Sequence, residues 1–151
     1  MIKTYLLTFL LIVSFVIGGC GKKETVKPNA KFLGTYKVND VWGSSKSEIG
    51  SGSLDYEMTI KPSGDTAIII DNINKTLVGV KGRVQGDSVI IEKQVAKSSS
   101  GTSYDVDPET GVLNGNKLTL NFGYHDLDKG NLIGYIVVTM NGVKDSTASS
   151  K

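Results

Sequence analysis

The most reactive side chain in this 151-residue chain is the thiol of Cys20, which is its only cysteine. Lys3 and an almost unbroken apolar run, residues 5–17, come before it, and Gly18 and Gly19 lie directly in front of it. One positive charge, an apolar run of about a dozen residues and small residues before a cut site are typical of an export signal. Cleavage behind the glycines would make Cys20 the new N-terminus.

Residues 17–20, an aliphatic residue followed by two glycines and a cysteine, resemble the lipobox of a bacterial lipoprotein signal peptide. The resemblance implies that residues 1–19 are removed and that Cys20 is lipidated on its thiol and acylated again on its amine, for example with palmitate. A transmembrane helix is disfavoured because the run is shorter than the roughly 20 residues that cross a bilayer. A soluble secreted protein would carry a free thiol at its start. The expected location is the cell envelope, with a lipid anchor in the outer membrane, on its periplasmic face or at the cell surface.

Residues 20–31 are predicted to be the lipidated cysteine and a flexible tether, because they are polar and lack an apolar period. Lys22, Lys23 and Glu24 partly resemble the signals that send some lipoproteins to the outer surface. The folded domain is expected over residues 32–142, followed by a polar tail, residues 143–151.

The other candidates for chemistry lie in the second half of the chain. His125 is the only histidine, and Asp126 and Asp128 follow it closely. An imidazole beside carboxylates could act in acid–base catalysis or bind a metal ion. Zinc needs three or four ligands, and neither a second histidine nor a nearby cysteine exists. Residues 105–111 alternate acidic side chains and end in glycine, but the twelve-residue calcium pattern is missing. We therefore expect no metal and no cofactor.

Catalysis and nucleic-acid binding are also not indicated. The serine-rich stretches, residues 44–53 and 98–103, lack the spacing of a nucleophile elbow, and one histidine would have to serve every triad. The net charge is only +2, and the charges are scattered rather than clustered. The chain is therefore expected not to be an enzyme and not to bind nucleic acid.

From residue 32 onward, apolar and polar residues alternate with period two between turn sequences, as in strands with one buried face. The clearest alternation covers residues 117–124, and Asn114-Gly115-Asn116 before it predicts a hairpin, as does Gly86-Asp87. Eight short strands joined mainly by hairpins favour an all-β, antiparallel up-and-down barrel over a sandwich. The expected strands cover residues 32–38, 56–60, 67–70, 78–84 (with Val78, Val80 and Val84 on one face), 89–91, a broken strand at 103–106 and 112–113, 117–124 and 132–140.

Three phrases of the sequence resemble bacterial lipocalin-like lipoproteins: Gly34-Thr35-Tyr36, residues 56–60 and residues 111–120. The resemblance implies a lipocalin-like barrel over most of residues 32–142. Tyr36 stands where lipocalins usually have tryptophan, and no arginine lies near the last strand. Ligand residues of the family are therefore not transferred.

Two functions remain open. A tethered binding protein would take a small hydrophobic or amphipathic ligand into a cup, with the membrane and this ligand as its partners and the chain as a monomer. A surface interaction module, such as a protease or lysozyme inhibitor, would instead use a filled barrel and the loops 43–53 and 97–103. Aromatic residues can line a cup or fill a core. The candidate ligand residues are Tyr36, Trp42, Tyr56, Met58, Leu120, Phe122 and Tyr124.

Overall fold

A computed structural model describes residues 26–44, 50–126 and 136–145, except for the side chains of residues 126 and 136–138. After one short turn of 3-10 helix, the described chain consists of β-strands joined by turns. The all-β prediction is confirmed. The elements are η1 (Ala30–Phe32), β1 (Gly34–Ser44), β2 (Ser51–Pro62), β3 (Ala67–Asp71), β4 (Leu77–Val78), β5 (Val80–Gln85), β6 (Ser88–Ile91), β7 (Gln94–Ser98), β8 (Ser103–Val106), β9 (Glu109–Asn114), β10 (Lys117–Asp126) and β11 (Ile136–Lys144).

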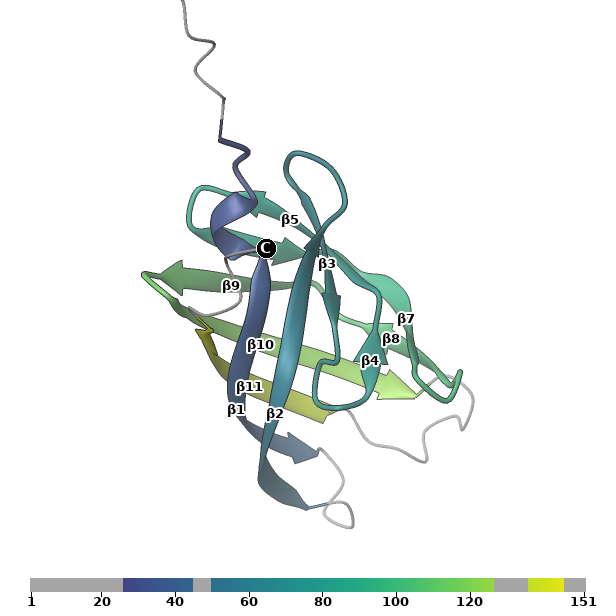
Figure 1. Cartoon of the computed structure of the whole chain (residues 1–151). Helices are drawn as coiled ribbons and strands as arrows, with labels where there is room; N and C mark the ends of the chain where they lie inside the picture. The colour runs from purple at the N-terminus through teal and green to yellow at the C-terminus, as the bar shows by residue number, and fades with distance from the viewer. Residues whose placement is uncertain (1–25, 45–49, 127–135, 146–151) are drawn as a thin grey trace, which may run out of the picture.

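The strands close into an antiparallel barrel (Figure 1). Its order is β1, β2, β3, β5, β6, β9, β10 and β11, and β11 pairs with both β10 and β1, which completes the ring. Each strand pairs with the next along the chain, once the short segments β4, β7 and β8 are joined to their continuations. The predicted up-and-down barrel of eight strands is thus confirmed for the described residues.

Three of the eight strands bend, and each bend divides one long strand into two segments. β4 continues into β5 through Gly79, whose φ of +70° suits glycine. The bend changes the alternation, because Leu77 and Val80 are both buried whereas Val78 is 37% exposed. The expectation that Val78 shares a face with Val80 and Val84 is therefore wrong. The other two bends lie at residues 92–93 and 107–108, and the latter confirms the predicted break in the sixth strand.

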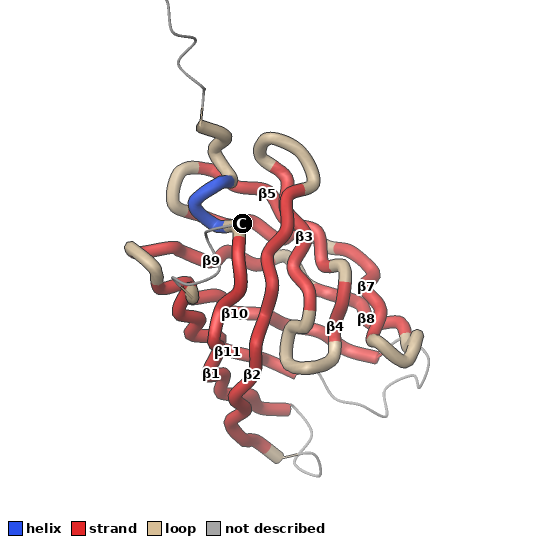
Figure 2. The backbone as a smooth tube through the Cα atoms, viewed as in Figure 1, coloured by secondary structure: helices blue, strands red, loops and turns tan. Residues whose placement is uncertain are grey.

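The short helix η1 closes one end of the barrel, which we call the closed end (Figure 2). Phe32 is fully buried there, and its carbonyl oxygen accepts a hydrogen bond from the Tyr36 hydroxyl at 2.8 Å. Asn29 is also buried, and its side-chain amide donates to the carbonyl oxygens of Gly64 and Ala67 at 2.8 and 3.0 Å. The fold therefore includes residues 29–31, which the sequence assigned to the tether.

The chain also leaves the barrel at the closed end. Lys144 still pairs with Tyr36, and the backbone N–H of Asp145 donates to the carbonyl oxygen of Thr35 at 2.9 Å. The last strand therefore extends past residue 142, where the polar tail was predicted to begin.

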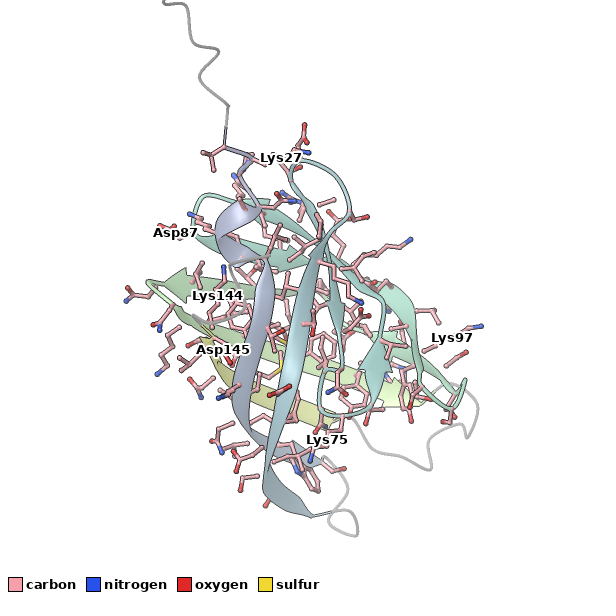
Figure 3. All side chains as sticks on the ribbon, in the orientation of Figure 1. Lys27, Lys75, Asp87, Lys97, Lys144 and Asp145 are labelled. Atoms are coloured by element: carbon pink, nitrogen blue, oxygen red, sulfur yellow. The ribbon has the colours of Figure 1, made fainter. Side chains whose placement is uncertain are left out.

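The opposite end of the barrel, which we call the mouth, carries the β3–β4 and β7–β8 connections, residues 72–76 and 99–102. In Figure 3, Lys27 marks the closed end and Lys75 the mouth. The predicted loop 97–103 is shorter than expected, because β7 ends at Ser98 and β8 begins at Ser103. The predicted loop 43–53 is also shortened by β1 and β2, and its residues 45–49 lie outside the described residues.

Inward-facing apolar side chains fill the middle of the barrel. The predicted hairpins at Gly86 and Gly115 are confirmed. These glycines have φ values of +59° and +61°, as tight hairpin turns require, and the turns fix which residues of the flanking strands face inward. Fully buried members of the core include Phe32, Ile60, Ile68, Ile70, Leu77, Val80, Val89, Ile91, Leu118, Leu120 and Phe122.

Candidate functional site

One carboxyl group lies inside the apolar barrel, on the inward face of β1. The inward residues of this strand are Tyr36, Val38, Asp40 and Trp42, because alternate residues of a strand face the same side. Asp40 is 0% exposed, and neither of its carboxylate oxygens has a hydrogen-bond partner among the described residues. Buried polar side chains normally have such partners. We therefore take Asp40 as the centre of the candidate site.

Two tyrosines lie near this carboxyl group, and Asn74 contacts both of them. The Tyr56 hydroxyl donates to the sulfur of Met140 at 3.0 Å, and Met140 is the cross-strand partner of Asp40. The Asn74 side-chain amide donates to the Tyr124 hydroxyl at 2.8 Å. The site thus combines a carboxyl group, two phenolic hydroxyls and an amide within an otherwise apolar core.

The β3–β4 connection holds Asn74 over the mouth. Asn72, Asn74 and Lys75 have φ values of +67°, +49° and +53°, a left-handed conformation that asparagine tolerates better than most residues. Between them, Ile73 is fully buried and exchanges two backbone hydrogen bonds with Leu77, at 3.0 and 2.9 Å. The buried isoleucine therefore holds the turn in place, with the Asn74 amide against Tyr124.

Burial shifts the titration of the groups at this site. Loss of solvent raises the pKa of Asp40 above its ordinary 3.8; the Tyr56 hydroxyl and the charge of Lys75 oppose the rise, and the charge of Asp55 adds to it. Burial also raises the pKa of Tyr56 and of Tyr124. Both phenols are therefore neutral at physiological pH.

A neutral replacement of Asp40 should stabilise the empty protein at high pH. A raised pKa in the folded state means that folding is favoured while Asp40 is protonated, and that this stability is lost as the pH rises through the raised pKa. We expect Asp40→Asn to raise the free energy of unfolding by about 1–3 kcal/mol at pH 8, because the ionised aspartate is a buried charged group without a partner, whereas the amide carries no charge. The gain should shrink toward zero below the ordinary pKa of 3.8, where the wild-type side chain is neutral too.

Urea denaturation of both proteins across this pH range measures the difference directly, and effects of other carboxylates cancel between them. Asp71 is one such group, because its hydrogen bond with Lys61 lowers its pKa. A difference that does not change with pH would show that Asp40 does not titrate in this window.

Trp42 lies nearer the mouth than Asp40, on the same face of β1. It is partly buried against the core and is directly paired with Gly52 of β2. A Cβ at residue 52 would lie 3.1 Å from the Trp42 ring atom Cζ2. The missing side chain of Gly52 therefore provides the space in which the indole lies beside the mouth.

The seven predicted ligand residues all lie on inward faces, but at different depths. Tyr36 lies near the closed end, and its hydroxyl donates a hydrogen bond to the Phe32 carbonyl oxygen. Met58, Leu120 and Phe122 are at most 1% exposed and belong to the packed middle. The structure brings Tyr56 and Tyr124 together beside Asn74, and Trp42 is partly buried against the core.

The sequence interpretation missed Asp40 and Asn74. A signal for Asp40 was present, since an acidic residue interrupts the inward apolar series Tyr36, Val38 and Trp42. No comparable signal exists for Asn74, whose role depends on contact with Tyr124, fifty positions away along the chain.

The other polar candidates lie outside this site. His125 pairs with Asp105 across β10 and β8, with 3.6 Å between the histidine Nε2 and a carboxylate oxygen, while Asp128 lies outside the described residues. Residues 105–111 belong largely to β8 and β9 rather than to a loop. Among the described residues, no three acidic, histidine or cysteine side chains come close enough to hold a metal.

The fold has a known structural counterpart. The chain is similar to the crystal structure of a putative outer membrane protein from Bacteroides fragilis, with a TM-score of 0.56 and 16% sequence identity. The similarity covers 80% of this chain and 54% of that protein, so this chain spans about half the length of its counterpart. The likeness shows the fold.

Neither a protein-family model nor a curated protein sequence matches the chain. The described residues contain no helix that is long and apolar enough to cross a membrane.

Proposed function

We propose that this protein is a lipid-anchored binding protein of the cell envelope, which takes a small hydrophobic or amphipathic ligand into the mouth of its barrel. The observation that carries the proposal is the unpartnered, fully buried Asp40 inside an apolar core. A buried carboxyl group without a partner lowers the free energy of unfolding, so its presence is not explained by a contribution to folding. Pairing with a ligand supplies a reason for it.

The surroundings of Asp40 support a binding site rather than a catalytic one. Tyr56 and Tyr124 keep their protons at neutral pH, and neither is adjacent to a histidine or lysine base in any described hydrogen bond. Apolar walls with a few converging polar groups are typical of small-molecule sites. We therefore propose that the protein binds its ligand without transforming it, as a monomer and without nucleic acid.

The lipid anchor on Cys20 belongs to the same proposal. The structural likeness to the Bacteroides fragilis protein supports an envelope location, and the signal-like residues 1–19 support lipidation at Cys20, with the outer membrane as the expected site. The described chain joins the barrel at the closed end, next to Asn29 (Figure 1). A lipid anchored through this end would leave the mouth facing away from the bilayer.

The packed middle of the barrel favours a second candidate, a surface interaction module that binds no small molecule. Met58, Leu120 and Phe122 leave little exposed surface in the interior. The short β7–β8 turn, residues 99–102, argues against the projecting contact loop that this function requires. A binding site limited to the mouth is compatible with a packed middle.

Native mass spectrometry of residues 21–151, purified gently without the anchor, tests the proposed function. The described barrel closes within these residues, so the shortened chain contains the whole fold. We expect an adduct that leaves on denaturation, or uptake of an apolar fluorescent probe with about micromolar affinity. A bare protein that takes up no probe would overturn the ligand-binding function and leave the interaction module.

A further inference from the structure

The candidate site contains two hydrogen-bond acceptors that no described donor reaches, the carboxylate oxygens of Asp40. An ionised aspartate only accepts hydrogen bonds, and both oxygens of Asp40 are without a described partner. The Tyr56 hydroxyl acts on Asp40 and lowers the pKa of that carboxyl group, but its described hydrogen bond is with the sulfur of Met140, and the Asn74 amide donates to Tyr124. A molecule that completes this site must therefore bring donor hydrogens of its own.

The charges around Asp40 also favour a cation. Lys75 acts on the carboxyl group through its charge, but its own side chain is exposed and makes no described hydrogen bond with Asp40. Asp55 adds a second negative charge from the outer face of β2. A positive group that reached Asp40 would thus compensate a buried charge which the protein leaves uncompensated.

The mouth offers an apolar surface next to this carboxyl group. Trp42, Leu54 and Tyr104 are partly buried and pack against the core with part of their surface exposed. Tyr104 also contacts Tyr124 edge to face, with 5.4 Å between ring centroids. Because Asp40 is enclosed, a ligand reaches it only if side chains at the mouth move.

We infer that the ligand is an amphipathic primary amine, whose ammonium group binds the Asp40 carboxylate and whose apolar body lies against Trp42, Leu54 and Tyr104. The inference rests on the proposed function and specifies its ligand class. An ammonium group carries three donors, of which two can be accepted by the Asp40 oxygens. The ligand would enter with its polar end first.

The test compares two probes that share one apolar chain, dodecylamine and 1-dodecanol, below their aggregation limits at pH 7. Isothermal titration of residues 21–151 gives the affinity for each. The variants are Asp40→Asn, which removes the inner charge, and Asp65→Asn, which removes an exposed charge at the closed end, away from the candidate site. Circular dichroism confirms that both variants are folded.

We expect the wild-type protein to bind dodecylamine about tenfold more tightly than dodecanol, or better, since charge-assisted hydrogen bonds are the strong ones. Asp40→Asn should abolish this preference, and Asp65→Asn should keep it. Equal binding of both probes to the wild type would overturn the inference that the ligand is an amine while leaving the proposed binding function intact. A preference for dodecylamine that survives in Asp40→Asn would do the same. Binding of neither probe would overturn the amine and the proposed function together.

Discussion

Replacing Cys20 by alanine is expected to release the protein almost completely from the membrane fraction. Each buried methylene of a lipid chain contributes about 0.8 kcal/mol to membrane binding, and two or more chains are needed for stable anchoring. Cys20 is the only thiol in the chain, so no other residue can receive a thioether-linked lipid. The loss of this one sulfur atom should therefore remove the entire anchor.

Fractionation of cells that express the wild type and Cys20→Ala measures this effect, and detergent phase partition confirms it. Lys23→Ala is the matched control, since it changes the same segment but keeps the thiol. The control should stay in the membrane fraction and have the mass of a lipidated chain that begins at Cys20. A Cys20→Ala protein that still sediments with membranes would show that the anchor lies elsewhere.

The segment that would carry the proposed anchor and the candidate site lie at opposite ends of the barrel. Asn29 docks on the turn between β2 and β3 at the closed end, while Asp40 and Asn74 lie toward the other end of the barrel. The segment that precedes Asn29 therefore leaves from the end that holds no part of the candidate site. A ligand would reach the mouth from the aqueous side, which suits an amphipathic molecule better than a fully apolar one.

Most of the barrel could be predicted because its determinants are local. The alternation over residues 117–124 and the turn at Gly115 specify β10 and its hairpin without reference to other strands. The bend at Gly79 could not be located in this way, because glycine interrupts a strand only where the neighbouring strands require it. The face of Val78 was predicted wrongly for this reason.

The candidate site was harder to predict than the fold, because it depends on contacts between distant segments. The aromatic residues Tyr56 and Tyr124 were selected correctly as inward-facing, but the alternation cannot say at which depth each one lies. The depth follows from the pairing of β1 with β2 and β11, which places Asp40 beside Met140. Likewise, the residues before the first strand look like a polar tether, and only the contacts of Asn29 with Gly64 and Ala67 include them in the fold.

Truncation of Phe32 to alanine should produce the largest loss of stability among single changes at the closed end. The ring is fully buried where η1 covers the barrel, and its removal leaves a cavity among residues of β1 and its neighbours. Replacement of a buried phenylalanine by alanine typically costs about 3–5 kcal/mol, a large part of the total stability of a small domain. We expect a loss in this range, with an unchanged dependence on urea.

Urea denaturation at pH 7 measures the loss, with Val26→Ala as the control, because Val26 is 83% exposed and precedes η1. Tyr36→Phe separates the ring from the hydrogen bond, since it removes only the donor to the Phe32 carbonyl group and should cost about 1 kcal/mol. A Phe32→Ala protein within about 1 kcal/mol of the wild type would show that η1 does not seal the barrel.

The two ends of the barrel should respond independently. Phe32→Ala weakens the closed end, whereas Asp40→Asn relieves the unpaired carboxyl group toward the mouth, and the two side chains share no described hydrogen bond. Their effects on the free energy of unfolding should therefore add, as they do for separate sites. The proposed ligand binding should be affected by Asp40→Asn alone, because Phe32 lies at the closed end, away from the candidate site.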